Sequence, residues 1–286
     1  MSQSGLQRTL AASVSVHGIG YWSDRDITVT FQPAEPDSGI VFVREDLPEK
    51  PRIPVSPEYR ISIPRRTSLE KNGARVEMVE HILSALTGMQ VDNCEIRVTG
   101  TEMPGMDGSA LAFVEAFESV GYETQDVPAH SLSLNAPLRQ EEVFSERHCF
   151  VSAGPADALR IAFEIRYAQL AAIGTQNAEF LITPETYRKE IAPCRTFVTR
   201  QEAEAFLSQG LARRATFQDL LVFDDSGLIG NSLRFPNECV RHKILDLIGD
   251  LALLKGRLNA KIQAFCSGHE LNAKLAQAIL AQNRKI

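Results

Sequence analysis

The sequence lacks the paired cysteines that mark a disulfide framework or a thiolate metal site. Such sites show even numbers of cysteines or closely spaced pairs. This chain of 286 residues has an odd number, far apart and without a Cys-x-x-Cys pair: Cys94, Cys149, Cys194, Cys239 and Cys266. We therefore expect separate buried thiols in a reducing cytoplasm, and we look for the chemistry at other residues.

A long hydrophobic run and an excess of positive charge are also missing. No apolar run approaches the roughly 18 residues of a membrane-spanning helix, so we expect none. The first residues, MSQSGLQRTLAAS, lack the pattern of a signal peptide, and we expect no such segment. The net charge of −6 argues against a nucleic-acid polymer as partner, because phosphate binding needs a basic surface. With 44% hydrophobic and 23% charged residues, the composition is that of a globular protein.

Hydrophobic periodicity predicts alternating groups of strands and helices. In the first half we expect strands over 27–33, 40–46 and 94–100, and helices over 79–86 and 109–121. In the second half we expect strands and helices over these ranges: strands 132–135, 149–152, 159–167 and 262–268, and helices 184–191, 200–209, 238–254 and 268–282.

Two stretches of the chain are similar to one another. Each has a V-x-H pattern opening a helix, then a strand, then a helix introduced by glycine. His81 precedes Gly108 by 27 positions, and His242 precedes Gly268 by 26. A duplicated unit explains this match. We therefore predict an α+β chain of two similar domains, 1–125 and 126–286, each a sheet with helices on one face.

The predicted helix 238–254 is mostly apolar but carries one narrow polar stripe. With His242 at 0°, Asp246 lies at about 40°, Asp250 at about 80° and Lys243 at about 100°. Carboxylates on a mostly buried helix are costly unless a cation, a metal or strong hydrogen bonds meet them. The stripe therefore favours a metal site. The alternative is a solvated stripe with ordinary i, i+4 pairing.

His81 is the candidate partner from the equivalent helix of the first half. Two histidines and the carboxylate of Asp246 would leave a fourth zinc position open for water. Glu80 projects roughly 100° away from His81, as a base that does not bind the metal should. The alternatives are a core histidine at position 81 and a solvated glutamate at position 80.

His269 lies at a helix start in the segment SGHELN. Opposite Asp250 it could be held as an imidazolium that donates a proton or stabilises an oxyanion. The alternative is a capping or surface histidine. We read the remaining histidines as ordinary: His17, His130 and His148.

Five segments in order carry a resemblance over nearly the whole chain: VEHILSAL, MDGSA (106–110), RTF (195–197), VRHKILDLIGDL and SGHELN. Together they resemble the UDP-3-O-acyl-N-acetylglucosamine deacetylase (LpxC) family, the zinc amidases of lipid A synthesis. The resemblance implies two α+β sandwich domains with the active site in the cleft between them. It also implies an insert in each domain, the second framing a passage for the substrate's acyl chain.

The resemblance implies a set of residue roles. The zinc ligands would be His81, His242 and Asp246. Glu80 would be the general base, and His269 would be the cationic partner, oriented by Asp250. Among the substrate-facing residues, Thr196 would hydrogen-bond the developing oxyanion. Lys243 would meet the diphosphate or sugar, and Phe197 would lie beside the glucosamine ring.

The implied protein is a cytoplasmic monomer that binds Zn²⁺ and hydrolyses a nucleotide-sugar lipid, UDP-3-O-acyl-N-acetylglucosamine, releasing acetate. Two alternatives stay open: a paralogous zinc amidase acting on another N-acetylated sugar conjugate, and a non-catalytic binding or regulatory relative that retains zinc. Iron or cobalt could also occupy a site of two histidines and one aspartate.

The chain departs from the family pattern at several positions. Where the family reads G-x-G-L-H-S-G, this chain has Trp22 in place of the histidine and Asp24 in place of the last glycine. A Tyr167-Ala168 pair stands where many members have His-Pro. Arg213 and Arg214 stand where the second insert has glycines. We expect the two arginines to narrow the acyl passage or change its polarity. The acyl length and the identity of the substrate therefore stay open.

Overall fold

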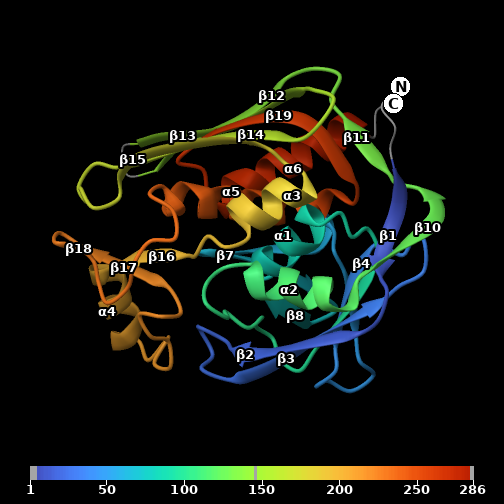
Figure 1. Cartoon of the computed structure of the whole chain (residues 1–286), viewed down its shortest axis with the longest axis horizontal. Coiled ribbons are helices and arrows are strands. Elements are labelled where there is room, and N and C mark those ends of the chain that lie inside the picture. The colour runs from blue at the N-terminus through green and yellow to red at the C-terminus, as the bar shows by residue number, and fades with distance from the viewer. Residues whose placement is uncertain (1–4, 145–146, 284–286) are drawn as a thin grey trace.

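The computed structural model describes residues 5–144 and 147–283. Helices and several separate sheets occur together along the chain, so the predicted α+β class is confirmed. Two larger sheets form the outer layers, and the main helices lie between them (Figure 1). This arrangement turns one face of each sheet toward the helices that lie between them.

The sheet of the first half has the strand order β2-β3-β9-β4-β5. Its strands are β2 (Val14–Ile19), β3 (Asp26–Pro33), β9 (Cys94–Val98), β4 (Ile40–Arg44) and β5 (Arg52–Pro54). Strand β4 runs parallel to β9, and the other neighbours are antiparallel. Strand β3 forms because apolar residues alternate with polar ones, so that Ile27, Val29 and Phe31 all face the core.

The sheet of the second half repeats this topology in the order β12-β13-β19-β14-β15. Its strands are β12 (Leu138–Phe144), β13 (Arg147–Pro155), β19 (Arg257–Phe265), β14 (Arg160–Tyr167) and β15 (Gly174–Leu181). Here β14 is parallel to β19 and the others are antiparallel. A short strand, β11 (Ser131–Ser133), adds a second parallel pairing to β19. Because order and direction match strand for strand, the repeated α+β unit is confirmed.

The helices repeat in the same way. Helix α1 (Glu80–Gly88) precedes β9, and α2 (Leu111–Val120) follows it. Correspondingly, α5 (Glu238–Leu251), extended by the 3-10 turn η3 (Ala252–Leu254), precedes β19, and α6 (His269–Asn283) follows it. Both ends of α1, α2 and α6, and the start of α5, lie within two residues of the predicted positions. Helix α5 ends three residues before the predicted end, and the turn η3 occupies those three residues. Helix α2 ends at Gly121, whose φ of 75° suits a glycine.

Each half also carries a small additional sheet. In the first half it consists of β6 (Arg60–Ile63), β7 (Arg66–Lys71) and β8 (Ala74–Glu77), preceded by the 3-10 turn η1 (Pro57–Tyr59). In the second half it consists of β16 (Phe197–Thr199), β17 (Leu221–Asp224) and β18 (Gly227–Leu228), with α4 (Arg200–Ser208) beside it at the left of Figure 1. The predicted helix 184–191 is split into α3 (Pro184–Thr186) and the π-helical turn η2 (Tyr187–Ile191).

The polar stretch 123–131, which contains the predicted division between residues 125 and 126, is not a loose linker. Most of it belongs to β10 (Tyr122–Pro128), which pairs antiparallel with β1 (Leu6–Leu10). A boundary after residue 125 therefore falls inside a strand. The division into 1–125 and 126–286 stays a prediction.

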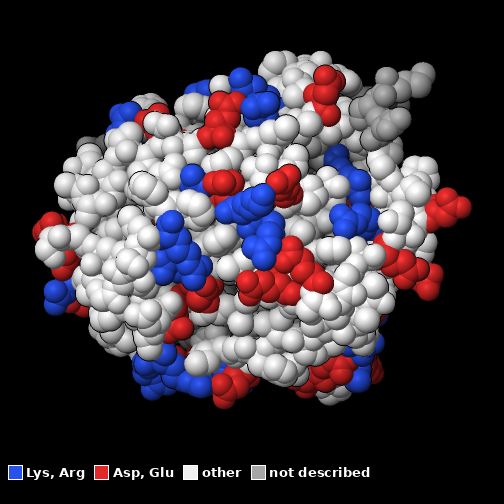
Figure 2. All heavy atoms as spheres, in the orientation of Figure 1, with Lys and Arg blue, Asp and Glu red and all other residues white. Residues whose placement is uncertain are grey.

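The shared core lies where α1 packs against α5. Ile82, Leu83 and Leu86 of α1 are fully buried, as are Leu247 and Ile248 of α5. Among residues 5–144 and 147–283, no helix is long and apolar enough to cross a membrane. On the face shown in Figure 2, acidic and basic side chains are interspersed, and no uniform basic surface forms there.

Candidate metal centre

The polar residues singled out on the two equivalent helices meet at the centre of the molecule. His242, Asp246 and Asp250 of α5 are 2%, 4% and 1% exposed, and Glu80 and His81 at the start of α1 are 3% and 5% exposed. The alternative of a solvated surface stripe is therefore wrong. These charged and polar groups are buried together, and burial on this scale requires compensation.

His81, His242 and Asp246 offer ligand atoms that all lie within 4.8 Å of one another. The Nε2 atoms of His242 and His81 lie 3.3 and 3.7 Å from the same carboxylate oxygen, Oδ1 of Asp246. The two imidazole rings stand nearly perpendicular, with centroids 5.1 Å apart. Three side chains from two helices thus converge on one point.

The hydrogen bonding of His242 indicates which kind of group fits between the three side chains. Its Nδ1 lies 3.0 Å from the carbonyl oxygen of Cys194, which only accepts, so Nδ1 carries the proton. In the neutral ring, Nε2 then has a lone pair that faces Asp246 Oδ1. Two acceptors facing each other repel unless a cation lies between them. The donor set therefore fits a metal ion.

The protonation states agree with this fit. Burial, with a further contribution from His242, lowers the pKa of His81 to about 3, so the ring is neutral. Burial alone would raise the pKa of Asp246, but His242 and Lys243 outweigh it and hold the pKa well below its usual range. The site thus presents a neutral imidazole at His81 and a carboxylate at Asp246. His81 Nδ1 has no hydrogen-bond partner within the described part of the chain.

Glu80 lies beside the convergence point but is held by other contacts. Its Oε2 accepts a hydrogen bond of 2.9 Å from the backbone N–H of Thr67, and its Oε1 lies 4.0 Å from His269 Nε2. Burial raises the pKa of Glu80 to about 7, against the opposing positive charge of His269. A carboxylate with a pKa near neutrality is suited to proton transfer.

His269, the first residue of α6, is paired with Asp250 as the sequence suggested. Its Nδ1 donates to Asp250 Oδ2 at 2.9 Å, and Asn272 Nδ2 donates to the same oxygen at 2.8 Å. Burial lowers the pKa of His269, but the charge and hydrogen bond of Asp250 outweigh it and raise the pKa to about 9. The imidazolium form therefore predominates at neutral pH, and the surface-histidine alternative is wrong, because the His269 side chain is only 12% exposed.

Two of the substrate-facing candidates are in contact with the metal-site segments. Lys243 Nζ lies 2.6 Å from Asp246 Oδ2, so this lysine is paired with the candidate ligand. Thr196 lies two residues after Cys194, and its backbone N–H donates to the carbonyl of Gly108. Thr196 is thereby fixed between the MDGSA segment and the start of β16.

Phe197, the third substrate-facing candidate, begins β16 and is half-buried. Its ring lies edge-on to Tyr167, with centroids 5.6 Å apart and an interplanar angle of 67°. Tyr167 is one of the positions where the chain departs from the family pattern. The aromatic pair joins the end of β14 to the second small sheet.

Three residues at which the chain departs from the family pattern lie together, because Asp24 contacts both Arg213 and Arg214. Asp24 Oδ2 accepts from Arg213 Nε, and Asp24 Oδ1 accepts from the backbone N–H of Arg214, both at 3.0 Å. Arg214 also pairs with Asp26 at 2.9 Å. The two arginines thus tie the loop after α4 to the first half of the chain. A narrowed acyl passage stays a prediction.

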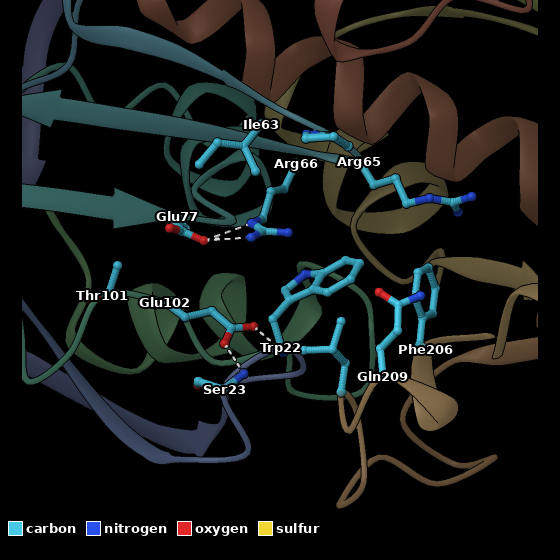
Figure 3. Close-up of a pocket in the computed structure, with 12 residues that line it drawn as sticks. Trp22, Ser23, Ile63, Arg65, Arg66, Glu77, Thr101, Glu102, Phe206 and Gln209 are labelled. Atoms are coloured by element: carbon cyan, nitrogen blue, oxygen red, sulfur yellow. Dashed lines mark hydrogen bonds and ion pairs between the residues drawn. The ribbon is translucent and has the colours of Figure 1, made fainter. Parts of the chain in front are cut away.

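Trp22 belongs to a separate pocket of about 520 Å³, shown in Figure 3. Its ring lies between the guanidinium of Arg66, 4.6 Å from the ring centroid, and Phe206, whose centroid is 5.0 Å away. Glu102 accepts from the backbone N–H groups of Trp22 and Ser23, each at 2.8 Å. None of the candidate metal or acid–base residues lines this pocket.

Sequence reasoning missed two residues at the centre. Thr67 contacts both Glu80 and Asp250 from strand β7. Gly249 of α5 faces the backbone of Glu80 so closely that a Cβ there would lie 2.1 Å from the Glu80 carbonyl oxygen. A glycine inside an apolar helical pattern could have signalled this close packing. Thr67 had no comparable signal.

Known proteins are similar to this chain over nearly its whole length. A family model described as UDP-3-O-acyl N-acetylglycosamine deacetylase matches residues 7–281. The UDP-3-O-acyl-N-acetylglucosamine deacetylase of Chlamydia felis is 39% identical over 277 residues, covering 96% of this chain and 97% of the relative. The protein of the same name from Thermosynechococcus vestitus is 40% identical over 276 residues, covering 96% and 94%.

Proposed function

The chain belongs to the UDP-3-O-acyl N-acetylglycosamine deacetylase family, and we propose that it removes the acetyl group of UDP-3-O-acyl-N-acetylglucosamine by zinc-dependent hydrolysis. The observation that carries the proposal is the convergence of His81, His242 and Asp246. Next to them in the chain and fold, Glu80 Oε1 lies 4.0 Å from His269 Nε2. This is the arrangement that metal-assisted amide hydrolysis needs.

The metal would be held by the two histidines and Asp246. A zinc ion there supplies Lewis-acid polarisation of the acetamide carbonyl and lowers the pKa of water to roughly 7. Cys194 supports this assignment, because its carbonyl orients the His242 ring so that Nε2 faces the ligand point. Lys243 neutralises the second oxygen of Asp246, which leaves Oδ1 directed at the histidines.

Glu80 and His269 would divide the proton transfers between them. Glu80, with a pKa of about 7, accepts the proton of the attacking water. His269, with a pKa of about 9, donates a proton to the departing amine and stabilises negative charge on the carbonyl oxygen before that. Asp250 holds the His269 ring in place throughout.

We assign the remaining roles by the family resemblance. Thr196 would hydrogen-bond the oxyanion, Lys243 would meet the diphosphate or sugar, and Phe197 would lie against the glucosamine ring. We propose a cytoplasmic monomer of two domains acting in lipid A biosynthesis. The five free cysteines suit a reducing compartment.

One alternative is a zinc amidase acting on a different N-acetylated sugar conjugate. The contacts of Asp24 with Arg213 and Arg214 favour it, because they alter the second insert at positions where the family has glycines. A non-catalytic relative is disfavoured, because Glu80, Asp250 and His269 are all present, with His269 hydrogen-bonded to Asp250 and 4.0 Å from Glu80.

The test is mass-spectrometric detection of the deacetylated product from UDP-3-O-acyl-N-acetylglucosamine with acyl chains of several lengths, with and without chelator. We expect product and acetate in equal amounts for at least one chain length, abolished by chelator and restored by zinc. Turnover of other N-acetylated sugar conjugates, with none of UDP-3-O-acyl-N-acetylglucosamine, would instead support the alternative substrate.

A further inference from the structure

Thr67 contacts both sides of the proposed acid–base machinery, Glu80 on one side and the His269–Asp250 pair on the other. It lies near the start of β7 and is 1% exposed. Its carbonyl accepts the backbone N–H of Val79, which immediately precedes α1. The strand is therefore attached to the helix start that presents Glu80. The side chain and the N–H of Thr67 remain free for contacts toward the site.

The backbone N–H of Thr67 determines how Glu80 is oriented. It donates to Oε2 at 2.9 Å, so this oxygen is occupied. The other oxygen, Oε1, lies 4.0 Å from His269 Nε2. Because a carboxylate held at one oxygen cannot rotate freely, Thr67 directs Oε1 toward the space between the base and the imidazolium.

The hydroxyl of Thr67 determines how Asp250 is oriented. Thr67 Oγ1 lies 2.5 Å from Asp250 Oδ1, and an ionised carboxylate only accepts, so the hydroxyl is the donor. The opposite oxygen, Oδ2, receives His269 Nδ1 and Asn272 Nδ2. The Asn272 amide is itself oriented, because its Oδ1 accepts from Ser267 Oγ at 2.5 Å. Donors on both sides thus lock the plane of the carboxylate that holds His269.

We propose that Thr67 is a positioning residue for the deacetylation, and that it holds Glu80 and the His269–Asp250 pair at a fixed separation across the site. This inference rests on the proposed function. Thr67 donates one hydrogen bond to Glu80 and one to Asp250, both from strand β7. A shift of β7 would therefore disturb the base and the residue that holds the acid at the same time. Misplacement by about 1 Å can reduce a catalysed rate by roughly 100-fold.

Two substitutions separate this role from simple packing. Thr67→Val keeps the β-branched shape and the backbone N–H to Glu80 but removes the hydroxyl. Thr67→Ser keeps the hydroxyl and removes a methyl group. Ser68→Ala is the matched control, because Ser68 is the next residue of β7, is fully buried, and its hydroxyl has no partner among the described residues.

We expect kcat of Thr67→Val to fall by about 10- to 100-fold, with KM and bound zinc within about twofold of the unsubstituted protein. Thr67→Ser should recover most of kcat, and Ser68→Ala should leave it unchanged. Full kcat in Thr67→Val would overturn the proposal. So would a Thr67→Ser protein as defective as Thr67→Val at an equal melting temperature, because the hydroxyl would then not be the group that matters.

A second readout does not depend on turnover. In zinc-loaded protein, the proton NMR signal of His269 Nδ1–H, assigned by its absence in His269→Gln, reports the bond to Asp250. It should move in Thr67→Val and return in Thr67→Ser. An unmoved signal would contradict the inference. A protein that turns over no UDP-3-O-acyl-N-acetylglucosamine would refute the proposed function, and the signal would still decide the position of Thr67.

Discussion

Gly249 of α5 and Glu80 of α1 meet backbone to backbone at the centre of the molecule. A Cβ on Gly249 would lie 2.1 Å from the carbonyl oxygen of Glu80 and 2.9 Å from its Cα. Only a residue without a side chain permits this approach. The separation of the two helices that carry the candidate ligands is therefore set by this glycine.

Gly249→Ala should push α1 away from α5 and move His81 away from His242 and Asp246. We expect zinc affinity to fall by at least about 10-fold and the unfolding free energy to fall by roughly 1–3 kcal/mol, as for an overpacked core. Competition with a chelating dye measures the first and urea unfolding the second.

Gly154→Ala is the control for this substitution. Gly154 lies in β13, and a Cβ there would meet no atom within 4 Å. We expect its zinc affinity to equal that of the unsubstituted protein. Unchanged zinc affinity in Gly249→Ala would show that the helix crossing does not control the metal site.

The metal ligands can be tested one at a time. His81→Ala, His242→Ala and Asp246→Ala should each weaken zinc binding by at least about 100-fold relative to a protein that holds about one zinc per chain. Metal analysis after dialysis measures this. His130→Ala is the control, because His130 is exposed and its imidazole pairs with Asp37, which is not a candidate ligand. Full zinc content in any of the three ligand variants would remove that residue from the proposed set.

The pH dependence should be bell-shaped. Glu80 acts as a base, so kcat/KM should rise with pH until its carboxyl is ionised, at a pKa of about 7. His269 acts as an acid, so kcat/KM should fall once pH passes its pKa of about 9. A bound cation lowers both values, so both limbs should lie at or below these pH values.

Substitution of each residue shows which group is responsible for each limb of the pH profile. His269→Gln should remove the basic limb and lower kcat by about 100- to 10,000-fold. Glu80→Gln should remove the acidic limb with a loss of similar size while retaining zinc. The exposed His148 serves as control, and His148→Gln should keep both limbs. A basic limb that persists in His269→Gln would belong to another group.

The loop after α4 offers a prediction that does not concern activity. Arg213 and Arg214 are exposed but held by Asp24. Asp24→Ala should free Arg213, whereas Arg214 keeps its pair with Asp26, so limited digestion with trypsin should cut after Arg213 faster. Global stability should change by only about 0–1 kcal/mol, as for an exposed ion pair. Glu141→Ala, which removes the exposed pair with Arg139, should leave the digestion rate unchanged. Equal digestion rates of Asp24→Ala and the unsubstituted protein would show that Asp24 does not hold this loop.

Much of the fold could be predicted because its signals are local. The stripe on α5 was visible from helical geometry, and the repeated V-x-H pattern pointed to the equivalent position on α1. The structure then placed His81 beside His242 and Asp246. The strand over 122–128 was not predicted, because its pairing with β1 depends on residues more than 100 positions away.

Residues whose importance arises only from tertiary contact could not be found in this way. Thr67 is an ordinary strand residue until it meets Asp250, 183 positions away in the chain. The same holds for Asp24 and Arg213, which were noted as separate departures and proved to be partners across 189 positions. No local period or spacing encodes such pairs.

The account is tested most directly by titrating metal-free protein with zinc while measuring acetate release from UDP-3-O-acyl-N-acetylglucosamine. We predict no acetate without metal, a rate that rises in proportion to zinc up to about one equivalent per chain, and a plateau beyond it. Glu80→Gln should bind the same equivalent of zinc and release almost no acetate. Acetate release at full rate from metal-free protein, or none at any zinc concentration, would contradict the proposal that this buried centre is a zinc deacetylase site.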